Sequence, residues 1–321
     1  MVATYRELFL RHLDEKRYTN EPVNLYEPIN YILDLGGKRM RPILTLMVCD
    51  LFGGEVTKAL DAAMAVEVFH NFTLIHDDIM DSAPLRRGKN TVHKKWDINT
   101  GILSGDAMMI LAFQTLETYK GDEFRNLMSV LIKTSLEVCE GQQYDIDFET
   151  RSDVTIEEYL NMIALKTSVL VAAAMKMGAI IANASEEDSN LMYQFGLNLG
   201  LAFQLQDDYL DTYGDPKSFG KQVGGDIIEN KKTFLVLKSL ELGSEEDARS
   251  LQLLLSEKYT DEDKVEKVKS VFDSTGAPSA ILQEIEAYTE KALSLLESMN
   301  LASEKKDLLK QFSRDLMQRT V

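Results

Sequence analysis

Two groups of aspartates carry the strongest chemical signal in this chain, and each has the pattern Asp-Asp-x-x-Asp. The six residues, called the two pentads below, are Asp77, Asp78, Asp81, Asp207, Asp208 and Asp211. An α-helix turns about 100° per residue, so carboxylates at i, i+1 and i+4 fall within an arc of about 100°. Each pentad is therefore expected to point three anions at roughly one place.

Carboxylates gathered in this way need a counter-charge, because unpaired buried charge is costly. Mg²⁺ prefers a few carboxylates together with water and phosphate oxygens. The two pentads therefore predict a two-sided magnesium clamp for a phosphorylated ligand. A solvated acidic helix face is the alternative, but both pentads end apolar stretches, residues 74–76 and 199–205, which a solvated face does not show.

The composition favours a helical protein with a large core. The chain has 321 residues, 45% of them hydrophobic, and no proline between Pro84 and Pro216. Its abundance of Leu, Met, Ala, Glu and Lys favours helices over strands. We expect one all-α domain over residues 1–321, in which long central helices carry the pentads.

The net charge of −17 argues against nucleic acid and anionic membranes as partners. Residues 1–17 lack the apolar core of a signal peptide. The most apolar stretch, residues 169–182, contains Lys176 and is expected to be too short to span a bilayer. Cys49 and Cys139 suit the core of a protein in a reducing compartment. We expect a soluble, cytoplasmic protein without stable membrane insertion.

Glycines and capping residues indicate where the helices begin and end. Gly36-Gly37 and Gly53-Gly54 each close a helical region, and a long apolar helix is expected over 56–82. A Thr-x-x-Glu capping box opens another helix over 155–182. Residues 214–225, rich in glycine, form the most loop-like segment.

Basic residues cluster near these elements. Lys38, Arg39 and Arg41 lie at a helix start, where they oppose the helix dipole, so a bound diphosphate explains them better than helix stability does. A solvated surface is the alternative for so short a run. Residues 86–89 add two arginines and a lysine just beyond the first pentad, and arginine suits bidentate phosphate contacts.

Other candidates lie further along the chain. Lys166-Thr167 interrupts an apolar helical run, and a buried lysine needs an anion. Lys221 and Lys231 are candidates for a closing contact over the site. His70 precedes Asp77 by seven residues and shares its helix face, so it is either a ligand-binding residue or an ordinary core histidine.

Taken together, these motifs resemble the trans-prenyl diphosphate synthases of the polyprenyl synthetase family, in particular the short-chain geranylgeranyl and farnesyl diphosphate synthases. The matching segments, in family order, are 36–42, His70, 74–81, 86–88, 166–167, 203–211, 220–221 and 224–231. The resemblance implies an isoprenoid-synthase-type bundle of about ten core helices around a central cavity, usually as a homodimer.

The resemblance also implies roles for individual residues. The pentads would hold three Mg²⁺ ions on the diphosphate of an allylic substrate, which is dimethylallyl, geranyl or farnesyl diphosphate. The residues implied to assist there are Arg86, Lys166, Thr167, Gln204, Lys221 and Lys231. The residues implied to bind isopentenyl diphosphate are Gly37, Lys38, Arg41, His70 and Arg87.

The product length depends on which side chain stops the growing tail. On an ideal helix Thr73 and Phe69 lie beneath Asp77 and Asp81, whereas Phe72 points about 140° away from Asp77. In the resembling family, a large residue at the position of Phe72 usually forms the floor of the pocket, the side chain that stops the growing tail. The small Thr73 after it leaves room for a somewhat longer tail. We expect a C20 product before C15, and not C30 or longer.

The implied reaction is Mg²⁺-dependent head-to-tail condensation of isopentenyl diphosphate with allylic diphosphates to a short all-trans product. A longer-chain synthase remains an alternative. A terpene cyclase would not need the second basic pocket of Lys38, Arg41 and His70. A regulatory subunit of a heteromeric synthase would tend to lose a pentad, and a calcium-binding scaffold would leave the basic motifs unexplained.

Overall fold

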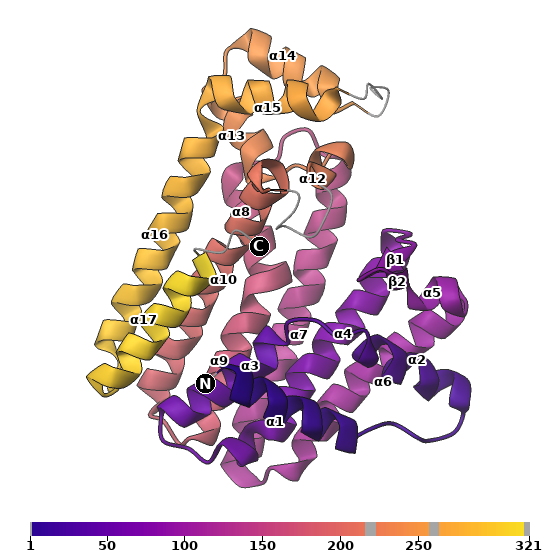
Figure 1. Cartoon of the computed structure of the whole chain (residues 1–321), viewed down its shortest axis with the longest axis vertical. Helices are drawn as coiled ribbons and strands as arrows, with labels where there is room; N and C mark the ends of the chain where they lie inside the picture. The colour runs from indigo at the N-terminus through magenta and orange to yellow at the C-terminus, as the bar shows by residue number, and fades with distance from the viewer. Residues whose placement is uncertain (1, 216–222, 257–262, 318–321) are drawn as a thin grey trace. The chain divides into compact units, whose positions relative to one another are not determined.

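The computed structural model describes residues 2–215, 223–256 and 263–317, which are almost entirely helical (Figure 1). The predicted all-α class is confirmed. One small antiparallel hairpin, of β1 (Leu85–Arg86) and β2 (Lys89–Asn90), contains the basic cluster of residues 86–89. The chain divides into two compact units. Unit 1 comprises Met1–Thr134 and Ala173–Tyr193, and unit 2 comprises Ser135–Ala172 and Gln194–Val321.

Unit 1 is built around α4, whose apolar residues pack mainly against α6 and also against α3. Its elements are α1 (Val2–Glu15), α2 (Val23–Asp34), α3 (Met40–Leu51), η1 (Val56–Ala59), α4 (Leu60–Met80), α5 (Val92–Lys95), α6 (Ile98–Thr115), η2 (Leu116–Thr118) and the first part of α7 (Gly121–Thr150). Phe69 and Ile75 of α4 and Met108 of α6 are fully buried in its core. The long helix expected over 56–82 is thus confirmed, with a 3₁₀ turn at its start.

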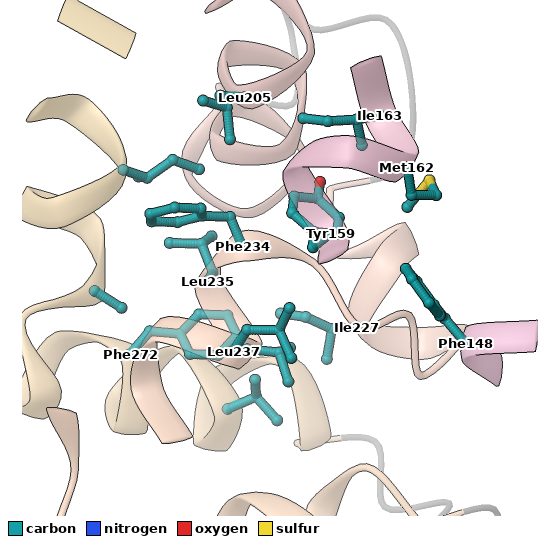
Figure 2. Close-up of a cluster of buried hydrophobic side chains, with 14 of the residues drawn as sticks. Phe148, Tyr159, Met162, Ile163, Leu205, Ile227, Phe234, Leu235, Leu237 and Phe272 are labelled. Carbon is teal, nitrogen blue, oxygen red and sulfur yellow. The ribbon is translucent and has the colours of Figure 1, made fainter. Parts of the chain in front are cut away.

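Unit 2 contains the later helices, and α7, α9 and α10 contribute residues to both units. Its elements are the second part of α7, α8 (Ile156–Ile163), the π-helical turn η3 (Ala164–Ser168), the first turn of α9 (Val169–Ile181), the second part of α10 (Glu186–Tyr213), α12 (Gly225–Ile228), α13 (Phe234–Leu242), α14 (Glu245–Leu254), α15 (Lys264–Thr275), α16 (Ala277–Ser298) and α17 (Ser303–Met317). Figure 2 shows its core cluster, in which Phe234 and Phe272 are fully buried and to which Tyr159 and Phe148 also belong. The capping box at Thr155 is confirmed.

The apolar stretch 169–182 forms the end of a longer helical run, which matches the helix expected over 155–182. The helical run Ile156–Ile181 has 26 residues and is long and apolar enough to span a bilayer by length and composition alone. The π-helical turn η3 does not break this run, so α8 continues through it into α9. Of its apolar window, 61% is buried inside the protein, as expected of a core helix.

Candidate active site

The basic run of unit 1 forms a sharply turned loop before α3. Gly36, Gly37 and Arg39 all have positive φ, at 83°, 116° and 52°. This backbone leaves Lys38 exposed but turns Arg39 into the protein. Arg41, in the first turn of α3, places its Nη1 atom 3.3 Å from Nε2 of His70 on α4. The loop therefore separates three neighbouring cations into different environments.

The β1–β2 hairpin brings a further arginine to this loop. Arg87 and Gly88 have φ of 53° and 75°, as a two-residue hairpin turn requires. The Arg87 guanidinium donates a hydrogen bond to the Gly36 carbonyl. A Cβ atom at Gly37 would lie 2.7 Å from Nη2 of Arg87, so only glycine admits this approach. The structure thus brings together Gly37, Arg41, His70 and Arg87, while their binding of a diphosphate stays a prediction.

His70 is neutral in this setting. Burial lowers its pKa well below the usual value, and Arg41, Arg87, Arg86 and Arg39 lower it further, in that order. A guanidinium has no acceptor, so Nε2 of His70 accepts from Arg41 and the imidazole proton lies on Nδ1. The half-buried ring is therefore a neutral group in a strongly positive environment.

The pH dependence of stability should report this lowered pKa. His70 takes up a proton less readily in the folded protein than in the unfolded chain. Protonation of the unfolded chain therefore favours unfolding as the pH falls below about 6.5, and the folded protein is most stable above that pH. We expect this in urea unfolding measured without metal between about pH 6.5 and 5. The free energy of unfolding of the wild type should fall by up to about 1.4 kcal/mol per pH unit more than that of His70→Gln. Other titrating groups are common to both proteins and cancel. Equal slopes would contradict a neutral, buried His70.

The first pentad, at the end of α4, does not present its three carboxylates equally. Asp78 is 1% exposed, and Nε of Arg86 donates to both of its oxygens at 2.9 Å. Burial raises the pKa of Asp78, and the bond from Arg86 opposes this rise. Asp77 is half-buried, with Oδ2 at 3.8 Å from Nη2 of Arg86, and Asp81 is exposed just beyond the last helical residue.

The second pentad, on α10, shows the same arrangement. Its middle residue, Asp208, is buried, and burial together with Asp226 raises its pKa to about 8. The Tyr159 hydroxyl donates to Oδ2 of Asp208, and Nε2 of Gln204 donates to Oδ1 at 3.1 Å. Asp211 is half-buried, and Oδ2 accepts from the Asp226 amide at 3.0 Å.

In each pentad, therefore, the middle aspartate faces the protein interior and the outer two are more accessible. The reason is angular: positions i and i+4 lie about 40° apart, while i+1 lies about 100° from the first. Among the described residues, no three His, Cys, Asp or Glu side chains already converge as a metal site. Like charges avoid one another, so convergence is not expected before a cation binds. The ligand role of all six aspartates stays a prediction.

Lys166 and Thr167 lie in η3, a rare helical form that often marks functional positions. The Lys166 ammonium binds the Asp145 carboxylate of α7. One turn earlier on α7, Gly141 lies directly against the backbone of η3, where a Cβ atom would meet the main-chain nitrogen of Lys166 and lie 2.7 Å from the Leu165 carbonyl carbon. The sequence predicted that a lysine in this apolar run needs an anionic partner. Asp145 is such a partner.

Of the two lysines proposed to close over the site, Lys221 lies outside the described residues. Lys231 is half-exposed and binds Glu229 at 2.8 Å and Asp226 at 3.5 Å. Burial lowers its pKa, but the bond to Glu229 and the charge of Asp226 outweigh this and raise it overall. Asp226 thus lies between Lys231 and the second pentad.

The sequence did not single out several residues that the structure places at these positions. These are Tyr159, which binds Asp208, Asp145, which binds Lys166, and Glu67, which binds Arg39. Asp226, which contacts Lys231, lies in the matching segment 224–231. No local pattern distinguishes Tyr159 or Glu67 from ordinary residues of apolar helices.

The residues expected to set product length lie on different sides of α4, which is unbroken from Leu60 to Met80. Phe72 is 7% exposed, and its ring lies 5.3 Å from that of Phe69 and 4.9 Å from that of His76. Thr73 is half-buried, and its hydroxyl donates to the His70 carbonyl at 2.8 Å. Thr73 therefore lies with His70 and Asp77 along one partly buried side of α4, called the stripe below, while Phe72 faces the core.

Comparison with known proteins supports one family. The model of the Polyprenyl synthetase family matches residues 22–272. The geranylgeranyl diphosphate synthase of Methanosarcina mazei is 44% identical over 233 residues, covering 72% of each protein. The geranylfarnesyl diphosphate synthase of Natronomonas pharaonis is 39% identical over 260 residues, covering 75% of this chain and 76% of that protein.

The structural comparison agrees. The crystal structure of a geranylgeranyl pyrophosphate synthase is 55% identical in sequence, with 99% of each chain covered and a TM-score of 0.95. The resemblance inferred from the motifs is thus confirmed over nearly the whole chain. This protein belongs to the polyprenyl synthetase family and is a prenyltransferase.

Proposed function

We propose that this prenyltransferase condenses isopentenyl diphosphate head-to-tail with dimethylallyl, geranyl and farnesyl diphosphates, and that all-trans geranylgeranyl diphosphate (C20) is its main product. The observation that carries the proposal is the β1–β2 hairpin. Its Arg86 binds the first pentad through Asp78, and the next residue, Arg87, binds the glycine loop beside Arg41. The two proposed diphosphate sites would thus be neighbours, an arrangement that a terpene cyclase would not need.

The donor set of the pentads fits magnesium. Carboxylate oxygens are hard ligands of the kind Mg²⁺ prefers, and the more accessible aspartates would hold the ions, three in number by the family pattern. The two middle aspartates, Asp78 and Asp208, would contribute mainly by fixing the helix ends through Arg86 and Tyr159. Bound Mg²⁺ would supply Lewis-acid stabilisation of the departing diphosphate.

The remaining chemistry belongs to the protein's own residues. Lys166, Lys231 and Lys221 would add positive charge where the allylic C–O bond breaks and negative charge develops on the diphosphate. Arg41 and Arg87 would hold isopentenyl diphosphate so that its double bond attacks the allylic carbon with little entropic cost. The new C–C bond forms, and a proton then leaves to the released diphosphate. No protein nucleophile is required.

The surface of α6 supports the proposal that the protein works as a homodimer. Four of its aliphatic side chains, Ile98, Ile102, Leu103 and Ile110, are between 40% and 60% exposed. A row of exposed aliphatic residues on one helix typically marks an interface, and a twofold axis would pair this face with itself. We further propose that residues 1–321 act as one functional domain, in the cytoplasm and without stable membrane insertion.

Product sizing tests both the reaction and the chain length. Purified protein incubated with isopentenyl diphosphate, each allylic diphosphate and Mg²⁺ should yield mainly C20. Thr73→Phe should shorten the product to C15, because Thr73 lies on the stripe that leads away from Asp77. Phe72→Ala should lengthen it, because its ring supports Phe69.

A control variant, Phe9→Ala, removes a fully buried ring from α1 and should lower stability without changing product length. If Phe72→Ala leaves the product unchanged while Phe69→Ala extends it, then Phe69 alone forms the floor. The absence of any condensation in the wild type would refute the proposed function.

A further inference from the structure

The basic run contains one cation that cannot reach a substrate. Arg39 is 4% exposed, and its guanidinium donates to the Glu67 carboxylate of α4 and to the Leu33 carbonyl in the last turn of α2. The Arg39 and Glu67 side chains are 2% and 3% exposed. Arg39 therefore ties three elements together: the end of α2, the start of α3 and the middle of α4.

The burial of this pair is not explained by stability alone. A buried ion pair loses the hydration of both charges and is often no more stabilising than apolar residues of similar volume. Arg39 also adopts a left-handed backbone, with φ of 52°, which is unfavourable for a residue with a side chain. Both features are understandable if the pair fixes a local geometry that function requires.

The geometry it fixes is that of the neighbouring cations. Arg39 stands between Lys38 and Arg41 in the chain, and its partner Glu67 lies one turn before His70 on α4. The inward turn of Arg39 leaves Lys38 exposed, and Arg41 lies against His70 at 3.3 Å. Burial lowers the pKa of Arg41, and the negative charge of Glu67 opposes this lowering.

We propose that the buried Arg39–Glu67 pair is a positioning device, which holds Lys38 and Arg41 in place for the diphosphate of isopentenyl diphosphate without contacting it. This inference rests on the proposed function. Neither residue is expected to take part in ionisation of the allylic substrate, because the hydrogen-bond partners of Arg39 are Glu67, ten residues before Asp77 on α4, and the Leu33 carbonyl, and neither belongs to a pentad. The expected signature is a change confined to the KM of one substrate.

The test uses the double variant Arg39→Met with Glu67→Met in the full-length protein. It removes one positive and one negative charge, so the net charge is unchanged and no unpaired buried charge remains. Asn71 keeps a partner, because its amide also donates to the Glu67 main-chain carbonyl at 2.8 Å. The KM for isopentenyl diphosphate should rise at least about tenfold, with kcat and the KM for the allylic diphosphate within about twofold of wild type.

A matched control is the exposed pair Arg17–Asp34, in which the Nη1 and Nη2 atoms of Arg17 donate to the carboxylate at 3.0 and 2.7 Å. Arg17→Met with Asp34→Met should leave all kinetic constants at wild-type values. Arg39→Lys provides a second test if the double variant does not fold. It keeps the charge but replaces the planar guanidinium by a compact ammonium on a shorter side chain, which does not reproduce the paired geometry toward Glu67 and Leu33. It should therefore also raise the KM for isopentenyl diphosphate.

A folded double variant, or Arg39→Lys, with the wild-type KM for isopentenyl diphosphate would overturn the inference. Equal rises in both KM values would overturn it as well, because they would indicate a general loss of structure. Failure of the proposed function would be seen differently, as a wild-type protein that does not condense the two diphosphates.

Discussion

Alanine at Asp77 or at Asp207 should each lower the condensation rate by about 10²–10³-fold or more, the largest effect expected of any single change. Both residues open a pentad and are more accessible than the aspartate that follows them, Asp78 or Asp208. Removing either would take hard oxygen ligands from one side of the magnesium clamp. The departing diphosphate would then lose part of its charge stabilisation.

Loss of metal binding can be separated from loss of fold. Mg²⁺ with inorganic pyrophosphate should raise the Tm of the wild type, and this rise should shrink in both variants. In the absence of metal, their Tm should equal or exceed that of the wild type, because like charges have been removed. Asp122→Ala, at the exposed start of α7, is the control and should keep full activity. Near-normal turnover in either pentad variant would refute the clamp.

Gly141→Ala should produce the second large effect, although Gly141 does not contact substrate. Its added methyl group would meet main-chain atoms of Lys166 and Leu165, which cannot rotate away as a flexible side chain would. Overpacking of this kind typically costs about 1–3 kcal/mol, and here it would displace η3, which carries Lys166 and Thr167. We expect kcat to fall by at least about tenfold, together with a lowered Tm.

The neighbouring substitution Glu140→Ala serves as the control, because it adds no bulk and Glu140 is exposed on the same helix. It should leave kcat and Tm close to wild type. Asp145→Asn complements both variants, since it weakens the hold on Lys166 without moving the backbone and should lower kcat with little loss of Tm. A fully active Gly141→Ala protein would show that the position of η3 is not critical.

The sequence by itself determined the features that depend on neighbours along the chain. The helical class followed from composition and periodicity, and the capping box at Thr155 located a helix start correctly, because a cap is satisfied within one turn. The family followed from the order of the motifs. The loop glycines at 36–37 were recognised as a helix end, although not as the place where Arg87 approaches.

Only the tertiary structure decided which residue of each motif faces the protein interior and which side chain binds it there. Lys38 and Arg39 are adjacent cations, but a left-handed backbone turns one outward and buries the other against Glu67. Helical periodicity gives the angle of a side chain about its own axis, but not which element packs at that angle. Partners such as Tyr159 for Asp208 come from distant segments, so their position is set by packing rather than by any local pattern.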